Sequence, residues 1–96
     1  MMVVVAYDIE TGDGEGKTRL RRMEKLCRKW GVMVQRSVYE CKLDAEKYRA
    51  MKAEVGSVIN SDKDEVRFYN LGNRFAGRIE QIGKVKSSWD WETYVI

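Results

Sequence analysis

Asp8 is the side chain that the sequence positions best for metal-dependent chemistry. It directly follows the apolar, β-branched run 2–7 and precedes the glycine-rich, acidic stretch 9–16. A carboxylate at the end of a buried strand is held rigidly and offers the hard oxygen ligand that Mg²⁺ binds. An aspartate at a strand end also commonly caps the following turn. One carboxylate is a poor Mg²⁺ site, so a catalytic, metal-binding Asp8 requires two symmetry-related chains.

The absence of histidine limits the chemistry further. The 96 residues contain none, which excludes Ser–His–Asp catalysis, Cys–His catalysis and every zinc site with an imidazole ligand. Acid–base or metal chemistry is then left to carboxylates, phenols, lysines and thiols. An all-oxygen site favours Mg²⁺, with Mn²⁺ as the other candidate.

Basic residues crowd one predicted helix. The segment 17–30 carries seven Lys and Arg against a single Glu, although the net charge of the chain is only +3. A solvated helix face, with basic residues favoured by the helix dipole, would explain part of this pattern. Seven cations without alternating anions favour a polyanionic ligand instead, because Arg and Lys bind phosphate groups. The candidate nucleic-acid-binding residues are Arg19, Arg21, Arg22, Lys25 and, outside this segment, Arg36.

The glycine-rich run 12–18 and its flanking residues match neither the P-loop motif for nucleotides nor the EF-hand motif for calcium. A P-loop needs a glycine where Thr11 stands, and the nearby carboxylates of Asp13 and Glu15 would repel phosphate. An EF-hand fails because Asp13 occupies the glycine position and Arg19 the position of the bidentate glutamate. The sequence therefore predicts neither nucleotide hydrolysis nor calcium binding.

Hydrophobic periodicity predicts seven elements around these residues. Apolar stripes at helical spacing predict one helix over 17–30 and a second that follows an N-cap at Asp44. β-Branched or alternating runs predict five strands, over 2–7, 32–43, 66–71, 76–82 and 89–96. Cys27 and Cys41 fall in apolar patterns, so we expect buried free thiols and a cytoplasmic protein. No apolar run is long enough to span a membrane, and we expect no membrane partner.

We expect the α+β class: a ferredoxin-like β-α-β-β-α-β antiparallel sheet with two helices on one face, in a single domain over 1–96. The first two predicted strands are apolar on both faces, so the face without helices needs a cover. A second copy of the chain is the economical cover, which predicts a homodimer. The C-terminal strand, about 89–96, is expected to pair with the sheet of the partner.

Four segments, in order along the chain, carry a family resemblance. They are Val3–Ile9 (Val-Val-Val-Ala-Tyr-Asp-Ile), Val34–Cys41 (Val-Gln-Arg-Ser-Val-Tyr-Glu-Cys), Asp64–Gly72 (Asp-Glu-Val-Arg-Phe-Tyr-Asn-Leu-Gly) and Arg78–Gly83 (Arg-Ile-Glu-Gln-Ile-Gly). Together they resemble the small CRISPR-associated adaptation proteins, the endonuclease-like partners of the CRISPR integrase. Tyr39 stands where that family usually has Phe, which keeps the ring and adds a hydroxyl.

The resemblance implies a ferredoxin-like homodimer whose two Asp8 side chains bind a divalent metal near the twofold axis. Some members of the family cut single-stranded RNA and others cut double-stranded DNA. Others serve as the scaffold that holds DNA within the integrase complex without cutting it. Arg19, Arg21 and Arg22 match the basic start of the first helix in the family. Ser37 and Tyr39 are candidate substrate contacts, although Tyr39 is also a natural packing ring.

Three functions from different classes follow from the sequence. The first is a metal-dependent endonuclease, and the second is a DNA-binding scaffold of the integrase complex. The third, a ferredoxin-like regulator that binds a metabolite, conflicts with the basic segment 17–30.

Overall fold

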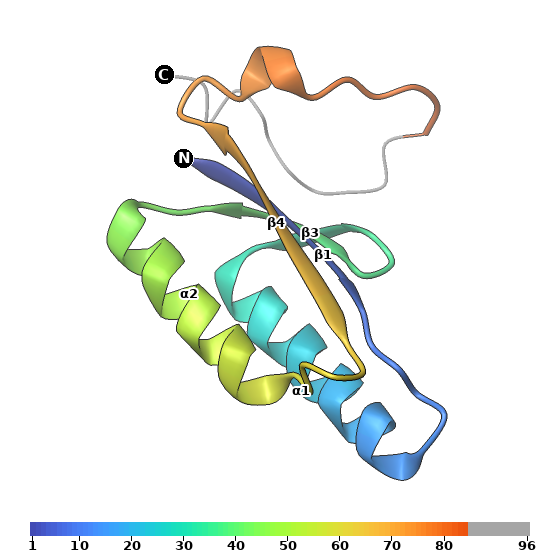
Figure 1. The fold of residues 1–96 in the computed structure, drawn as a ribbon. Coiled ribbons are helices and arrows are strands. Elements are labelled where there is room, and N and C mark those ends of the chain that lie inside the picture. Colours follow the sequence, from blue (N-terminus) through green and yellow to red (C-terminus); the bar gives the residue numbers. More distant parts are fainter. Residues whose placement is uncertain (85–96) are drawn as a thin grey trace.

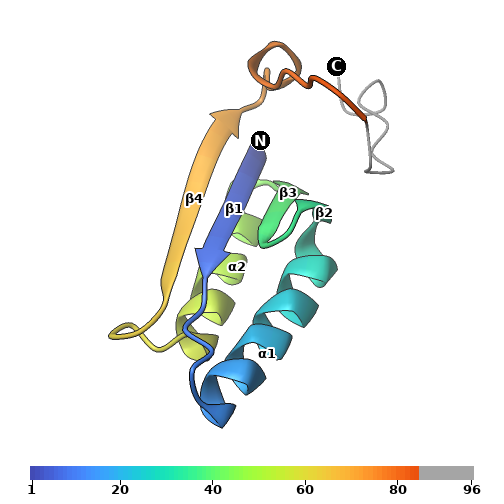
Figure 2. The ribbon, with the colours of Figure 1, turned by 90° about the vertical axis from the view of Figure 1, so that its right-hand side faces the viewer.

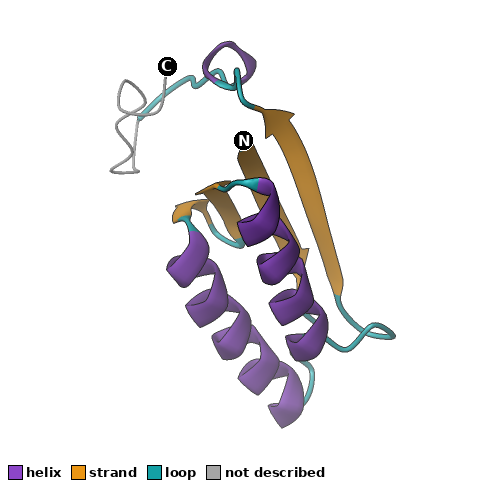
Figure 3. Cartoon of the chain, turned by 90° about the vertical axis from the view of Figure 1, so that its left-hand side faces the viewer, coloured by secondary structure: helices purple, strands orange, loops and turns teal. Residues whose placement is uncertain are grey.

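The computed structural model describes residues 1–84, which form an antiparallel sheet with two helices packed on one face (Figures 1 and 3). The elements in chain order are β1 (Met2–Asp8), α1 (Gly14–Trp30), β2 (Val32–Gln35), β3 (Val38–Lys42), α2 (Ala45–Val58), β4 (Glu65–Gly72) and the short 3-10 helix η1 (Ala76–Arg78). The order across the sheet is β2-β3-β1-β4. This arrangement confirms the predicted α+β, ferredoxin-like fold. The predicted strand over 89–96 lies outside the described residues.

The strand predicted over 32–43 is wrong in one respect, because it is a hairpin of two strands. The chain reverses at Arg36 and Ser37, and Ser37 has a φ of 63°. The sequence carries no Gly, Pro or Asn at this turn, so its alternating pattern continues through the reversal.

The strand predicted over 76–82 is also wrong. Residues 73–84 contain no strand, and Ala76–Arg78 forms a single 3-10 turn. The amide of Arg78 donates to the carbonyl of Phe75 at 2.9 Å, which closes this turn. A backbone that curls in this way cannot pair with a neighbouring strand.

The hydrophobic core lies between the sheet and the helices. Tyr39 and Cys41 of β3 are fully buried there, next to apolar side chains of β1 and the inward stripes of both helices. Cys27 and Cys41 are buried free cysteines, as predicted. Burial raises the pKa of each thiol to about 12. Both thiols are therefore protonated at neutral pH.

The second helix follows the predicted pattern closely. The Asp44 side chain accepts a hydrogen bond from the amide of Lys47 at 2.8 Å, which caps α2. Met51 and Val55 of its apolar stripe are buried against the core.

None of the helices within residues 1–84 is long and apolar enough to cross a membrane.

Candidate metal and nucleic-acid sites

Asp8 is the last residue of β1 and its side chain is exposed. β1 is a central strand, with β3 on one side and β4 on the other (Figure 2). In the register of β1 and β4, Asp8 lies directly opposite Glu65. No hydrogen bond or ion pair joins the Asp8 carboxylate to another of the described residues. The strand therefore presents a carboxylate whose oxygens are available to a ligand.

The backbone on both sides of Asp8 is held in place. The amide of Tyr7 donates to the carbonyl of Ser37 in the β2–β3 turn at 3.1 Å. On the other side, the Ile9 side chain is buried in the core, and the amide of Glu10 donates to Asp64 Oδ1 at 3.0 Å. The direction in which Asp8 leaves the sheet is thus fixed by two hydrogen bonds and one buried side chain.

The donor chemistry at this position fits Mg²⁺ or Mn²⁺, whereas the number of donors in one chain does not. Carboxylate oxygen is the ligand that these hard cations prefer. The carboxylate of Glu65 contacts the guanidinium of Arg67, with Oε1 3.0 Å from Nε. Among residues 1–84 there is no group of three or more Asp, Glu or Cys side chains that could hold a metal ion. A metal at Asp8 needs further ligands from a second molecule or from water.

The two candidate substrate contacts occupy different environments. Ser37 belongs to the turn beside the end of β1, as the hydrogen bond from Tyr7 shows. Tyr39 is fully buried, and its ring stacks on that of Tyr7 with centroids 6.1 Å apart. The assignment of Tyr39 as a substrate contact is therefore corrected, because its side chain has no exposed surface with which to reach a nucleic acid. Burial raises the pKa of both phenols.

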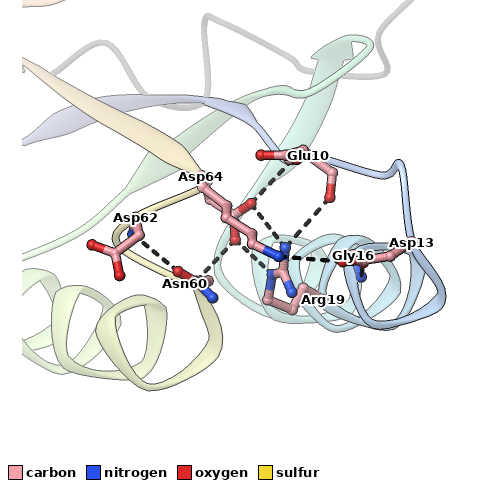
Figure 4. A network of polar contacts seen from close by, with 8 residues as sticks. Glu10, Asp13, Gly16, Arg19, Asn60, Asp62 and Asp64 are labelled. Atoms are coloured by element: carbon pink, nitrogen blue, oxygen red, sulfur yellow. Dashed lines mark hydrogen bonds and ion pairs between the residues drawn. The ribbon is translucent and has the colours of Figure 1, made fainter.

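Arg19 has a structural partner that the sequence did not suggest. Its Nε lies 2.7 Å from Asp64 Oδ2, and the exposed fractions of the two side chains are 11% and 0%. Its Nη2 also donates to Asp64 Oδ1 at 3.3 Å and to the carbonyl of Glu10 at 3.4 Å (Figure 4). We therefore remove Arg19 from the candidate nucleic-acid contacts, because its guanidinium is occupied within the fold.

Asp64 accepts hydrogen bonds from three separate parts of the chain (Figure 4). Besides Arg19 and the Glu10 amide, the amide of Asn60 donates to Asp64 Oδ2 at 2.9 Å. Burial by itself would raise the pKa of Asp64, but these hydrogen bonds outweigh it and hold the pKa below its usual value. Asp64 joins the β1–α1 loop, helix α1 and the α2–β4 turn.

Four candidate nucleic-acid contacts remain exposed: Arg21, Arg22, Lys25 and Arg36. Within residues 1–84, Arg21 Nη2 donates to the Thr18 hydroxyl at 3.5 Å, about one helical turn away. Arg22 lines an open hollow between α1 and the end of α2. Arg36 lies at the tip of the β2–β3 hairpin, near the end of β1. These four residues are placed where they can bind phosphate groups, and their role stays a prediction.

Other cations of α1 already have acidic partners. Lys29 Nζ lies 2.6 Å from Glu54 Oε1 of α2. Arg28 Nη2 lies 3.6 Å from Glu24 Oε2, one helical turn away. The free positive charge of the helix is therefore smaller than its composition suggests.

The acidic residues before α1 have a local role that the sequence analysis missed. The helix begins at Gly14 rather than at residue 17, and the Asp13 side chain accepts from the amide of Gly16 at 2.7 Å. This hydrogen bond, together with Lys63 Nζ at 3.3 Å, lowers the pKa of Asp13. Aspartate is a preferred N-cap residue, because its side chain can accept a hydrogen bond from the main-chain amide three residues later. Glu15 then lies in the first turn, where the helix dipole favours an acid.

The family model described as CRISPR associated protein Cas2 matches residues 1–79. The chain belongs to this family. The Cas2 assignment confirms the resemblance that the four sequence segments carry.

Two named relatives and one solved structure are similar to this chain. The CRISPR-associated endonuclease Cas2 of Halalkalibacterium halodurans is 40% identical over 96 residues, which cover 100% of this chain and 99% of that protein. The CRISPR-associated endoribonuclease Cas2 of Nitratidesulfovibrio vulgaris is 37% identical over 92 residues, covering 96% of this chain and 89% of that protein. The crystal structure of Streptococcus pyogenes Cas2 at pH 6.5 superposes with a TM-score of 0.75 and 38% identity, covering 86% of this chain and 100% of that one.

Proposed function

We propose that this Cas2 chain is the homodimeric, nucleic-acid-binding subunit of a cytoplasmic CRISPR adaptation complex, where it partners the integrase. We further propose a metal-dependent endonuclease activity on RNA or double-stranded DNA. The observation that carries the proposal is Asp8, an exposed carboxylate on a backbone fixed at Tyr7 and Glu10. The names of its relatives, endonuclease and endoribonuclease, support hydrolysis of phosphodiesters. The two free, buried cysteines suit the reducing cytoplasm.

The activity requires two chains. Of the two carboxylates that face each other at the paired ends of β1 and β4, that of Glu65 contacts Arg67, so Asp8 alone provides one ligand from each chain. Two Asp8 side chains across a twofold axis would supply a carboxylate oxygen from each chain to Mg²⁺, and water would supply its remaining ligands. Val4 and Ala6 of β1 lie on the sheet face opposite the helices and are half-buried within one chain. This part of the face therefore offers apolar surface to a second copy.

Each group of the chain has a defined task in this mechanism. Mg²⁺, when bound, activates water and stabilises the charge that develops on the phosphate. Asp8 holds the cation, and the exposed Arg21 and Lys25 hold the phosphate backbone. Because the chain has no histidine, the proton on the leaving oxygen comes from water.

A scaffold role without cleavage is the second candidate function. The observation that favours it is the incomplete set of metal ligands in one described chain. In this role the same basic residues hold double-stranded DNA within the integrase complex, and Asp8 is not needed for chemistry.

The substitution Asp8→Asn tests the metal site, with Glu10→Gln as the matched control. Both substitutions remove one negative charge from exposed side chains two residues apart. We expect Asp8→Asn to reduce Mg²⁺-dependent cleavage to the level seen with EDTA, while duplex binding and the thermal midpoint stay unchanged. Glu10→Gln should cleave like the wild type. Cleavage by Asp8→Asn at the wild-type rate would refute the assignment of Asp8.

A spacer-acquisition assay with the same two variants separates the two functions. If cleavage matters in the cell, Asp8→Asn loses acquisition, whereas Glu10→Gln keeps it. Normal acquisition by Asp8→Asn identifies the chain as a scaffold.

A further inference from the structure

The buried carboxylate of Asp64 lies next to the candidate metal site without belonging to it. Its side chain has no exposed surface and accepts hydrogen bonds from Arg19 and from the amides of Glu10 and Asn60. Glu10 follows Asp8 by two residues. A carboxylate whose oxygens are all engaged by the fold cannot bind a metal itself, but it can hold the chain that does.

We propose that Asp64 is a positioning residue that fixes the direction of the Asp8 carboxylate. The backbone around Asp8 is attached at Tyr7, through the Ser37 carbonyl, and at Glu10, through Asp64 Oδ1. The first attachment belongs to the sheet, where β1 already pairs with two strands. The second is the hydrogen bond that holds the chain after it leaves the sheet. Loss of Asp64 leaves the buried Ile9 side chain to hold this side without the hydrogen bond at Glu10, so the direction of Asp8 is less closely fixed.

Arg19 completes the positioning unit by orienting the Asp64 carboxylate. It reaches both oxygens, through Nε at 2.7 Å and Nη2 at 3.3 Å, and it also donates to the Glu10 carbonyl at 3.4 Å. Glu10 is thus held at its amide by Asp64 and at its carbonyl by Arg19. This geometry gives the arginine a task in the fold, because it orders the peptide units that follow Asp8.

A second ion pair joins the same two segments and provides the control. Lys63 Nζ lies 3.3 Å from Asp13 Oδ2, but the exposed fractions of these side chains are 40% and 48%. Exposed pairs contribute little to order, whereas breaking a buried, hydrogen-bonded pair leaves uncompensated polar groups. Lys63→Gln therefore removes a link of similar sequence span without removing the buried carboxylate.

Amide hydrogen exchange of wild type, Asp64→Asn and Lys63→Gln tests the positioning role directly. We expect Asp64→Asn to accelerate exchange at the amides of Ile9 and Glu10 by about tenfold or more over Lys63→Gln, while Val5 in β1 and Leu26 in α1 keep their protection. Equal exchange at Ile9 and Glu10 in the two variants overturns the proposal. If Asp64→Asn does not fold, Arg19→Gln replaces it, with the same expected pattern, because Asp64 then loses the group that orients it.

Mn²⁺ titration, followed by paramagnetic broadening of the Asp8 amide signal, connects the positioning role to the proposed metal site. Because the inference rests on the proposed function, the wild type is measured first. We expect Asp64→Asn to bind Mn²⁺ about 10–100-fold more weakly, as for residues that orient metal ligands, and excess Mn²⁺ should restore its cleavage because Asp8 is still present. Unchanged Mn²⁺ affinity in Asp64→Asn overturns the role. If wild-type Asp8 does not respond to Mn²⁺, the proposed metal site fails, and hydrogen exchange alone decides whether Asp64 holds this chain.

Discussion

The main-chain amide of Tyr7 donates a hydrogen bond to the carbonyl of Ser37 at 3.1 Å, which ties the β2–β3 turn to β1 one residue before Asp8. Ser37 reaches this position with a φ of 63°, in the left-handed region that side chains other than Gly and Asn adopt at a cost. The turn that supports the candidate site therefore depends on the backbone conformation of a single serine.

Ser37→Val is expected to lower the free energy of unfolding by about 1–2 kcal/mol, because a β-branched side chain is strained at positive φ. Ser37→Gly is the control, since Gly adopts this conformation freely. Urea unfolding of the three proteins measures the difference. A Val variant as stable as the Gly variant would show that the turn can relax.

Gly16→Ala is expected to destabilise the protein by about 1–3 kcal/mol, although Ala is the better helix former. A Cβ at residue 16 would overlap the backbone carbonyl of Glu10, which Arg19 also contacts. Gly56→Ala in α2 is the matched control, because a Cβ there meets no atom within 4 Å. We expect it to stabilise the protein by about 0.5–1 kcal/mol. Thermal unfolding of both variants shows whether the close approach at Gly16 is required.

Glu40→Gln is expected to raise the free energy of unfolding at pH 7. Glu40 is 6% exposed, and its buried Oε1 has no hydrogen-bond partner among the described residues. Burial raises the pKa of Glu40 above its usual value of 4.5. The stability that protonated Glu40 contributes is therefore fully present below about pH 4.5. It is lost as the pH rises through the pKa that Glu40 has in the folded state.

The gain from Glu40→Gln should accordingly shrink when urea unfolding is repeated near pH 4.5. Glu80→Gln, at an exposed glutamate, is the control and should show no such difference between the two pH values. A gain from Glu40→Gln that is the same at both pH values would exclude ionisation as its cause.

Replacement of Arg21 and Lys25 by Gln is expected to weaken DNA binding and its dependence on salt. Each lost phosphate contact reduces the slope of log K against log salt by about 0.9 for duplex DNA. Both side chains are exposed on α1. Lys52→Gln is the control, since Lys52 lies on α2 with its Nζ 4.2 Å from the centroid of the Tyr48 ring. An unchanged slope in the double variant would remove this face of α1 from the DNA interface.

Local sequence patterns were sufficient for the elements that depend on local interactions. The N-cap at Asp44 and the apolar stripe of α2 were both predicted, because a cap and a helical period are encoded within a few residues. The β2–β3 turn was missed for the complementary reason. Arg36 and Ser37 do not have the composition of a tight turn, and tertiary pairing with β1 selects their conformation.

The candidate site could be predicted only in part for a related reason. Asp8 was found because it ends an apolar strand, which is a local signal. The pairing of Arg19 with Asp64 joins residues 45 positions apart, so the sequence showed a basic residue in a basic helix and nothing of its partner. The fold determines which acidic residues lie beside the helix. Only then is it known which basic residues form ion pairs and which are available to a ligand.

The pairing of β1 with β4 constrains the order in which the sheet can form while the protein is being synthesised. Met2 pairs with Gly72 and Asp8 with Glu65, so the first strand to be made receives its second neighbour from one of the last described segments. The β2–β3 hairpin and both helices are complete before that neighbour exists. On the ribosome, the end of β1 therefore lacks its β4 neighbour until residue 65 has been added, and Asp8 can face Glu65 only after that point.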